Sequence, residues 1–146
     1  MDAASRAGVP VVVVRHSEPA TEDTFQASTE AWQLRPEVQS RRRDHLVDKR
    51  MPGSFTNTDL EAFLRGRGVD TVVISGYMTQ MCCDTTARQA AHMSLGVEFL
   101  ADATGTLDMD NEAGRIGAEE LHRSVLVTQQ SAFARVVSTE EWIAGL

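Results

Sequence analysis

The sequence predicts one globular domain of the α/β class with a mainly parallel sheet. Continuous apolar runs rich in β-branched residues, such as residues 9–15 and 71–76, are typical of strands buried on both faces. Segments with helical spacing separate these runs, which indicates a doubly wound β-α-β order with right-handed crossovers. The length of 146 residues, with 42% hydrophobic and 24% charged residues, fits a single core.

The elements follow in order along the chain. Strands are predicted over residues 9–15, 45–49, 71–76, 97–101 and 124–128, and helices over residues 58–66, 82–95, 112–122 and 140–146. In the first helix Leu60, Phe63 and Leu64 have core-facing spacing, and Gly96 ends the second helix. The polar stretch 17–40 is long for a connection, so it is either an active-site lid or a partner-facing loop.

The charge and the hydropathy pattern restrict the partners. The net charge is −7 and the isoelectric point is near 5.0, which argues against a nucleic-acid partner. The basic run from Arg41 to Arg43 is interpreted as a solvated loop or helix end. The longest apolar run, residues 9–14, is far shorter than a membrane span, and no export signal precedes it. The expected partner is a small-molecule substrate.

Both cysteines lie in the segment 76–88, which joins a predicted strand to a predicted helix. This places Cys82 and Cys83 at the carboxyl edge of the sheet, where open α/β sheets bind ligands. A thiol at a helix N-terminus lies near the positive end of the helix dipole and near free backbone amides, which favour the thiolate. The same amides can stabilise an oxyanion. Cys82 is therefore a candidate nucleophile, and the open alternative is that both cysteines are small core residues.

The cysteines and histidines predict neither a disulfide nor a metal site. Adjacent cysteines rarely bridge without strain, and two free thiols suit a reducing cytoplasm. There is no CxxC pair, and the four histidines are scattered singly. We therefore expect no metal and no cofactor.

A specific spacing gives the first indication of a family. The pattern Gly76-x-x-Thr79-x-x-Cys82-x-x-x-Thr86-Ala87 resembles the nucleophile motif of the isochorismatase-like cysteine hydrolases, which include nicotinamidases and carbamoylsarcosine amidohydrolases. Further similar segments occur in the family's order: residues 8–11 leading to Arg15-His16, Lys49 followed by Ser54-Phe55 and Thr58-Asp59-Leu60, and Asp102-Ala103. The resemblance spans roughly residues 8–130 and implies a three-layer α/β/α, Rossmann-like fold as a single domain over residues 1–146.

The resemblance also implies roles for individual residues. Cys82 matches the nucleophile, and Lys49 matches the lysine that stabilises the thiolate and the developing negative charge. A non-proline cis peptide is implied between Tyr77 and Met78, with the amides of Met78 and Cys82 forming the oxyanion hole. Cys83 falls where the family usually has valine, so it is interpreted as a core residue.

Four further residues are candidates for the pocket, namely His16, Trp32, Phe55 and Thr79. His16 ends a predicted strand and either faces the pocket or is a hydrogen-bonded structural residue. Trp32 and Phe55 either line a substrate wall or pack inside the domain. The metal-binding Asp-x-His-x-His segment of nicotinamidases has no counterpart between residues 15 and 49, which argues against that activity in particular.

The sequence departs from the family pattern at its N-terminus. Family members begin with an apolar strand that ends in the catalytic aspartate and becomes the central strand of the sheet. Here no apolar strand precedes Val9, and Asp2 is in an unsuitable context. Three explanations stay open: a truncated chain, a five-stranded sheet in which the remaining strands close the gap, or cover by a partner chain. In a complete chain another carboxylate, such as Asp48 or Asp102, would act as the base.

The sequence therefore predicts hydrolysis of a small amide, or of an isochorismate-type vinyl ether, through a covalent Cys82 intermediate. The alternative is a catalytically impaired relative that binds a small molecule or a protein through the same pocket. A redox role for the Cys82-Cys83 pair is a third hypothesis. By resemblance alone, a homo-oligomer, dimer or tetramer, is expected. The identity of the substrate is not encoded in any diagnostic motif of residues 17–40.

Overall fold

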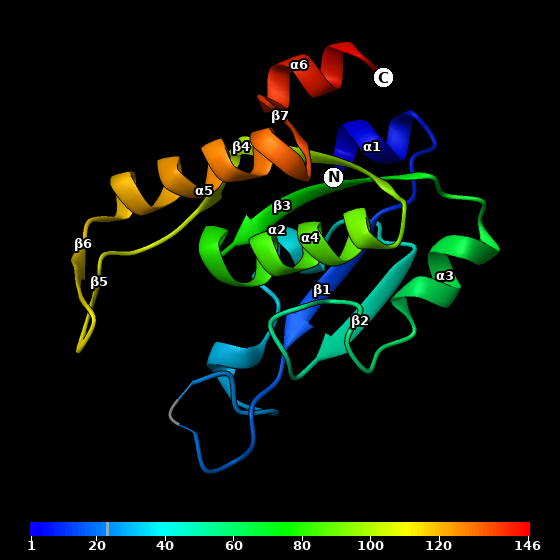
Figure 1. The fold of residues 1–146 in the computed structure, drawn as a ribbon. Coiled ribbons are helices and arrows are strands. Elements are labelled where there is room, and N and C mark those ends of the chain that lie inside the picture. The colour runs from blue at the N-terminus through cyan, green and yellow to red at the C-terminus, as the bar shows by residue number, and fades with distance from the viewer. Residues whose placement is uncertain (23) are drawn as a thin grey trace.

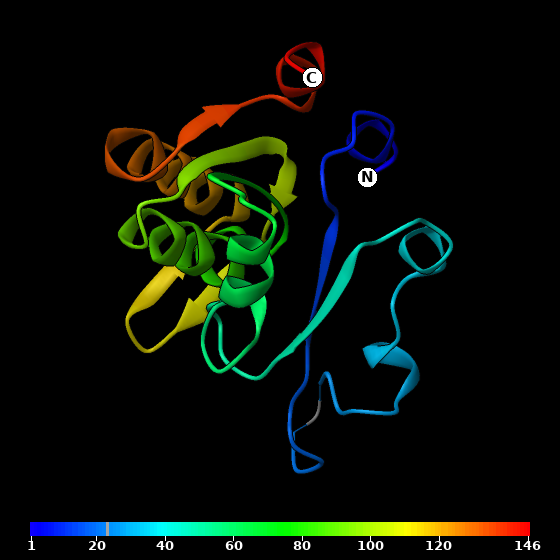
Figure 2. The ribbon, with the colours of Figure 1, turned by 90° about the vertical axis from the view of Figure 1, so that its right-hand side faces the viewer.

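The strands form two separate parallel sheets and one antiparallel pair (Figures 1 and 2). This computed structural model describes residues 1–22 and 24–146. The elements are α1 (Asp2–Arg6), β1 (Val12–His16), the 3-10 helix η1 (Glu30–Trp32), α2 (Pro36–Gln39), β2 (His45–Lys49), α3 (Leu60–Gly66), β3 (Thr71–Tyr77), the π-helical turn η2 (Thr79–Cys83), α4 (Asp84–His92), β4 (Gly96–Gly105), β5 (Met109–Asn111), β6 (Gly114–Ile116), α5 (Ala118–Ala132), β7 (Arg135–Val137) and α6 (Thr139–Ala144). The predicted class, α/β with mostly parallel sheets, is confirmed.

The first sheet contains β1 and β2, which pair in parallel from Val12 opposite His45 to His16 opposite Lys49. The second sheet has the order β3-β4-β7, also parallel. Within the described residues no ladder joins β1 to β3, so the strands do not close into one five-stranded sheet as one of the explanations required. Val13 is buried whereas Val14 is 38% exposed, so β1 is not buried on both faces as its composition suggested.

The core lies between the second sheet and the helices that cover it. α4 packs on β4, and α5 packs on β4 and β7, on the same side of the sheet in Figure 2. Phe99 and two small residues of α4, Ala87 and Ala90, have no exposed surface. Small side chains let the helix approach the sheet closely, so the apolar residues of β3 and β4 are covered by α4.

Two predicted elements are wrong. Residues 124–128 were expected as a strand but lie inside α5, because Leu121, Val125 and Gln129 recur at helical spacing and Gln129 is fully buried. Residues 112–122 were expected as one helix, but the chain first forms the antiparallel hairpin β5-β6 and α5 begins at residue 118. Gly114 has a φ of 139°, which suits glycine and supports the turn of this hairpin. The strand β7, only three residues long, was not predicted.

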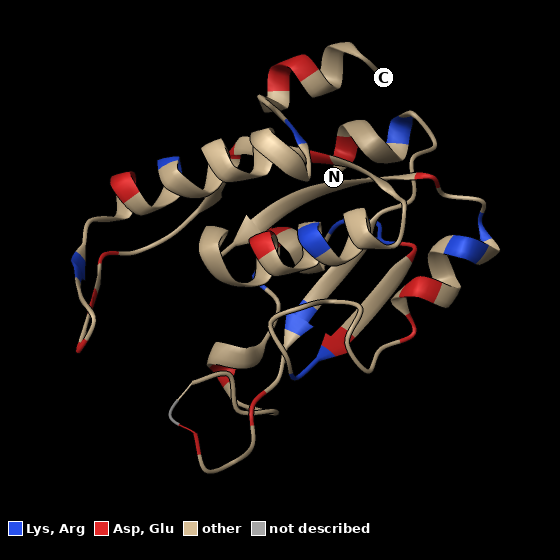
Figure 3. Cartoon of the chain, in the orientation of Figure 1, with Lys and Arg blue, Asp and Glu red and all other residues tan. Residues whose placement is uncertain are grey.

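The long segment between β1 and β2, described over residues 17–22 and 24–40, contains η1 and α2 (Figure 1). The basic run that follows α2 makes contacts within the chain: Arg41 pairs with Asp2, and Arg42 pairs with Asp44. Acidic and basic residues are both spread over the described elements, and α6 carries acidic residues alone (Figure 3). Among the described helices none has both the length and the apolar character that crossing a bilayer requires.

Candidate active site

The candidate nucleophile lies in the π-helical turn η2, between the end of β3 and the start of α4. The sequence placed Cys82 at the first residues of a helix, and the structure places it two residues before α4 begins. It is partly exposed, whereas Cys83 is only 4% exposed and belongs to the core cluster. Burial, and after it the neighbouring Cys82, raise the pKa of the Cys83 thiol to about 12. Cys83 is therefore a protonated core residue.

The backbone next to Cys82 has the features that the sequence implied. The peptide bond between Tyr77 and Met78 is cis. The Met78 carbonyl accepts hydrogen bonds from the amides of Met81 and Cys83. Among the residues that the structure describes, the Met78 amide donates to no carbonyl or side chain. A free amide near a thiol is suited to bind a negative oxygen, and the Cys82 amide lies in the turn that follows.

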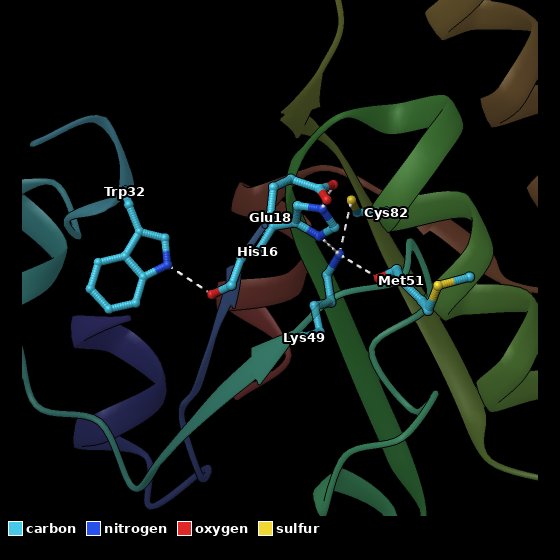
Figure 4. A network of polar contacts seen from close by, with 7 residues as sticks. His16, Glu18, Trp32, Lys49, Met51 and Cys82 are labelled. Carbon is cyan, nitrogen blue, oxygen red and sulfur yellow. Dashed lines mark hydrogen bonds and ion pairs between the residues drawn. The ribbon is translucent and has the colours of Figure 1, made fainter. Parts of the chain in front are cut away.

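Lys49 connects the two sheets at this point (Figure 4). It is the last residue of β2, and although it is a lysine it is only 4% exposed. Its Nζ donates hydrogen bonds to the sulfur of Cys82 at 3.2 Å, to the Met51 carbonyl at 2.9 Å and to Nδ1 of His16 at 3.1 Å. An ammonium group has three protons, so these acceptors match its full donor capacity.

His16 is the last residue of β1 and lies directly opposite Lys49 in the parallel ladder. Because the ammonium of Lys49 can only donate, Nδ1 of His16 is the acceptor in their contact. The other ring nitrogen, Nε2, lies 2.5 Å from Oε1 of Glu18. The edge of the His16 ring also faces Phe25, with ring centroids 5.8 Å apart. His16 is therefore joined to Cys82 through Lys49 and is hydrogen-bonded on both ring nitrogens, which fits either of its two sequence interpretations.

The structure places the other pocket candidates elsewhere. Trp32 donates from Nε1 to the Ser17 hydroxyl at 2.7 Å and stacks under the guanidinium of Arg15, so it points away from Cys82 (Figure 4). Phe55 is a member of the buried core cluster. Thr79 has no exposed surface and is hydrogen-bonded to Nδ1 of His122 at 2.8 Å. Phe55 and Thr79 are therefore buried within the domain, and Trp32 contacts Ser17 and Arg15 rather than Cys82, so for Trp32 and Phe55 these contacts fit the packing alternative.

The two carboxylates considered as replacement bases are engaged in other contacts. Asp48 forms a two-point ion pair with Arg15, at 2.7 and 2.9 Å, and these hydrogen bonds hold the pKa of Asp48 below its ordinary value. Asp102 accepts from the amide and hydroxyl of Thr139 at the start of α6, and these bonds hold its pKa low as well. Neither carboxylate contacts Cys82, so neither takes the place of the missing acid.

Sequence reasoning missed Glu18. A signal for it was present, because residues two apart in an extended chain lie on the same side and Glu18 follows His16 by two positions. The backbone of Glu18 is held by a hydrogen bond from its amide to the Phe25 carbonyl at 2.9 Å. The Met51 carbonyl was also missed, and nothing in the sequence marks it. Within the described residues no three His, Cys, Asp or Glu side chains gather as metal ligands.

Comparisons with known proteins identify relatives along nearly the whole chain. The family model described as "Isochorismatase domain" matches residues 1–141. The isochorismatase family protein YddQ of Bacillus subtilis is 31% identical over 93% of this chain and 76% of its own length. Nicotinamidase 3 of Arabidopsis thaliana is 30% identical, over 97% of this chain and 73% of its own length.

Solved structures agree with these relatives. An isochorismatase-type crystal structure from Burkholderia xenovorans LB400 is 48% identical, with a TM-score of 0.97 over 99% of this chain and 70% of that chain. A cysteine hydrolase from Pseudomonas syringae pv. phaseolicola 1448A is 30% identical, with a TM-score of 0.90 over 98% of this chain and 74% of that chain. These similarities extend through both sheets and the turn that carries Cys82.

Proposed function

Since this chain belongs to the isochorismatase family of hydrolases, we propose that it hydrolyses a small amide through a covalent intermediate on Cys82. The observation that supports this most directly is the contact between a buried ammonium, Lys49, and the Cys82 sulfur at 3.2 Å. A nearby positive charge favours the thiolate over the thiol, and the thiolate is the attacking form of cysteine.

In the first half of the reaction the Cys82 thiolate attacks the carbonyl carbon of the amide. A carbon–sulfur bond forms, and the carbonyl π electrons move to the oxygen. The amides of Met78 and Cys82, together with the Lys49 ammonium, stabilise this negative oxygen. When the tetrahedral species collapses, the carbon–nitrogen bond breaks and the leaving amine takes up the proton that the Cys82 thiol gave up, which leaves a thioester on Cys82.

In the second half a water molecule attacks the thioester carbon. The carbon–oxygen bond forms and gives a second oxyanion. Its collapse breaks the carbon–sulfur bond, and one water proton goes to the sulfur, so that the products are a carboxylic acid and the regenerated Cys82 thiol. The same two backbone amides stabilise the second oxyanion, because the negative oxygen develops at the same place. Partial exposure of Cys82 lets water reach this carbon, whereas the 4% exposure of Cys83 excludes it from the chemistry.

Relatives support a small amide as the substrate class. Among them are a nicotinamidase and, at 34% identity over 64% of this chain, the ureidoacrylate amidohydrolase RutB of Methylobacterium radiotolerans. The names of both describe cleavage of a carbon–nitrogen bond. An isochorismate-type vinyl ether is the variant within the family, since the matching family model carries that name.

A non-catalytic binding protein is the second candidate. In the described part of the chain no carboxylate contacts the Cys82 sulfur, which is the feature that favours this candidate. A binding protein would retain the same pocket geometry but release no product. Binding and turnover must therefore be measured on the same compounds.

Iodoacetamide labelling and ammonia release test the proposal. We expect faster alkylation of Cys82 at pH 7 than of a free thiol, and release of ammonia from a small primary amide. Cys82→Ser should lose turnover by at least about a thousandfold. Alkylation no faster than that of a free thiol would refute the activated nucleophile. Saturable binding of an amide without ammonia release would favour the binding protein.

A further inference from the structure

The hydrogen-bonded path that begins at Cys82 continues past Lys49 to two residues at the end of β1. Resting on the proposed function, we propose that His16, oriented by Glu18, is a positioning residue that fixes Lys49 and stores the proton leaving the Cys82 thiol. The path runs from Cys82 Sγ to Lys49 Nζ at 3.2 Å, from Nζ to His16 Nδ1 at 3.1 Å, and from His16 Nε2 to Glu18 Oε1 at 2.5 Å (Figure 4).

The contacts of the two ring nitrogens define the tautomer of His16. Lys49 donates to Nδ1, so Nδ1 holds a lone pair and the ring proton of the neutral imidazole is on Nε2. That proton points at the carboxylate of Glu18. A histidine with one nitrogen on a donor and the other on a carboxylate has its ring orientation and its tautomer defined from both sides.

The proton that leaves the Cys82 thiol can reach His16 through Lys49. Lys49 passes one Nζ proton to Nδ1 of His16, and the freed lone pair of Nζ takes the proton of Cys82. One nitrogen–hydrogen bond and the sulfur–hydrogen bond break, and two nitrogen–hydrogen bonds form. The result is a thiolate, an ammonium as before, and an imidazolium paired with the Glu18 carboxylate. Charge and atoms balance, and the same path in reverse can return the proton when the amine leaves.

The groups around His16 decide which of them can take this proton. Three charged or titratable groups lie along this path with His16: Lys49 from β2, Glu18 from its own segment, and Cys82 from η2 through Lys49. The remaining candidate carboxylates, Asp48 and Asp102, are held by Arg15 and Thr139. The side chains of His16 and Glu18 are only 20% and 31% exposed, so their interaction is partly shielded from water.

Conservative substitutions separate orientation from proton storage. His16→Asn retains an acceptor for Lys49 but cannot take a proton, and Glu18→Gln retains an acceptor for Nε2 but cannot balance an imidazolium. The readout is the rate of iodoacetamide alkylation of Cys82 from pH 5 to pH 10, measured by mass spectrometry, which requires no known substrate. His45→Asn is the matched control, because His45 contacts Asp59 and Phe63 instead.

We expect His16→Asn to slow alkylation at pH 6.5 by about tenfold and to move the profile to higher pH, with a smaller change in the same direction for Glu18→Gln. His45→Asn should reproduce the wild-type profile. A wild-type profile for a folded His16→Asn protein would overturn the inference and leave the proposed function intact. If His16→Asn does not fold, a wild-type profile for Glu18→Gln overturns it instead. A wild-type protein that reacts like a free thiol would refute the proposed function itself.

Discussion

Replacing Lys49 by methionine tests the central interaction of the site. Methionine is close to lysine in length and apolar, so it occupies the same buried space without the charge. Two unit charges 3.2 Å apart attract by roughly 5 kcal/mol at an effective dielectric constant of about 20. Cys82 is partly exposed, so only part of this energy should reach the measured rate.

An opposite charge at this range typically changes the thiolate population by between about tenfold and a thousandfold at fixed pH. We therefore expect Lys49→Met to be alkylated at Cys82 between about 10 and 1000 times more slowly than the wild type at pH 7. Labelling with iodoacetamide, followed by mass spectrometry of the modified peptide, measures this rate. Thermal unfolding of both proteins establishes that they are folded. A folded Lys49→Met protein that is alkylated at the wild-type rate would refute the role of the ammonium.

Three further perturbations test the surroundings of the site. Cys83→Ala should leave alkylation of its neighbour within about twofold of the wild-type rate, because burial raises the pKa of Cys83 to about 12 and its thiol is protonated at neutral pH; a large loss of labelling would contradict this. Thr79→Val leaves Nδ1 of His122 without its 2.8 Å partner and should lower the free energy of unfolding by about 1–3 kcal/mol in urea titrations, whereas an unchanged midpoint would speak against that bond. The Arg15 pair holds the pKa of Asp48 low, so its stabilisation is present above the ordinary carboxyl pKa of about 4 and is lost as the pH falls through the lowered value. Asp48→Asn should therefore flatten the acid side of a plot of unfolding temperature against pH. The change should be small, because the Asp48 side chain is 48% exposed. An unaltered slope would count against a stabilising ion pair between Arg15 and Asp48.

The sequence predicted the elements that carry the site better than the elements around it. The strand before Cys82 was recognisable because residues 71–74 form a continuous β-branched run, which has few other interpretations. The strand ending at Lys49 was a weaker candidate, since Val47 is its one β-branched residue. The region from residue 109 to residue 128 was misread, since Val125, Leu126 and Val127 look like a strand when taken alone. Only the spacing to Leu121 and Gln129 identifies the helix, and tertiary packing decides between the two.

The candidate site residues that were chosen from sequence motifs lie together in the structure, and those chosen by residue type do not. Residues tied to a spacing motif, Lys49 and Cys82, are brought together across the two sheets. Residues chosen by type alone, Trp32 and Phe55, lie in other environments, because an aromatic side chain has many places to pack. Glu18 could not be chosen from type, since a glutamate after a strand is ordinarily solvated. Its role depends on the orientation of His16, which appears only in three dimensions.

The two halves of the site are held together by contacts away from the nucleophile. Lys49 and Cys82 come from sheets that share no ladder in the described residues, so their 3.2 Å separation must be fixed elsewhere. The loop after β2 supplies that connection: the Ser54 amide and hydroxyl bond to the hydroxyl of Thr86, at 3.1 and 2.9 Å, on the helix that follows Cys82.

A neighbouring contact lies against the glycine that precedes this serine. Gln89, one turn further along α4, donates to the Thr56 hydroxyl at 2.8 Å, and a Cβ on Gly53 would overlap its carboxamide. A side chain at residue 53 would therefore displace the end of the Gln89 side chain from its hydrogen bond with Thr56. Both Ser54 and Thr86 are buried, so water competes little with their hydrogen bonds. The distance between the ammonium and the thiol is thus determined by a buried polar contact between a loop and a helix, and not by the pairing of strands.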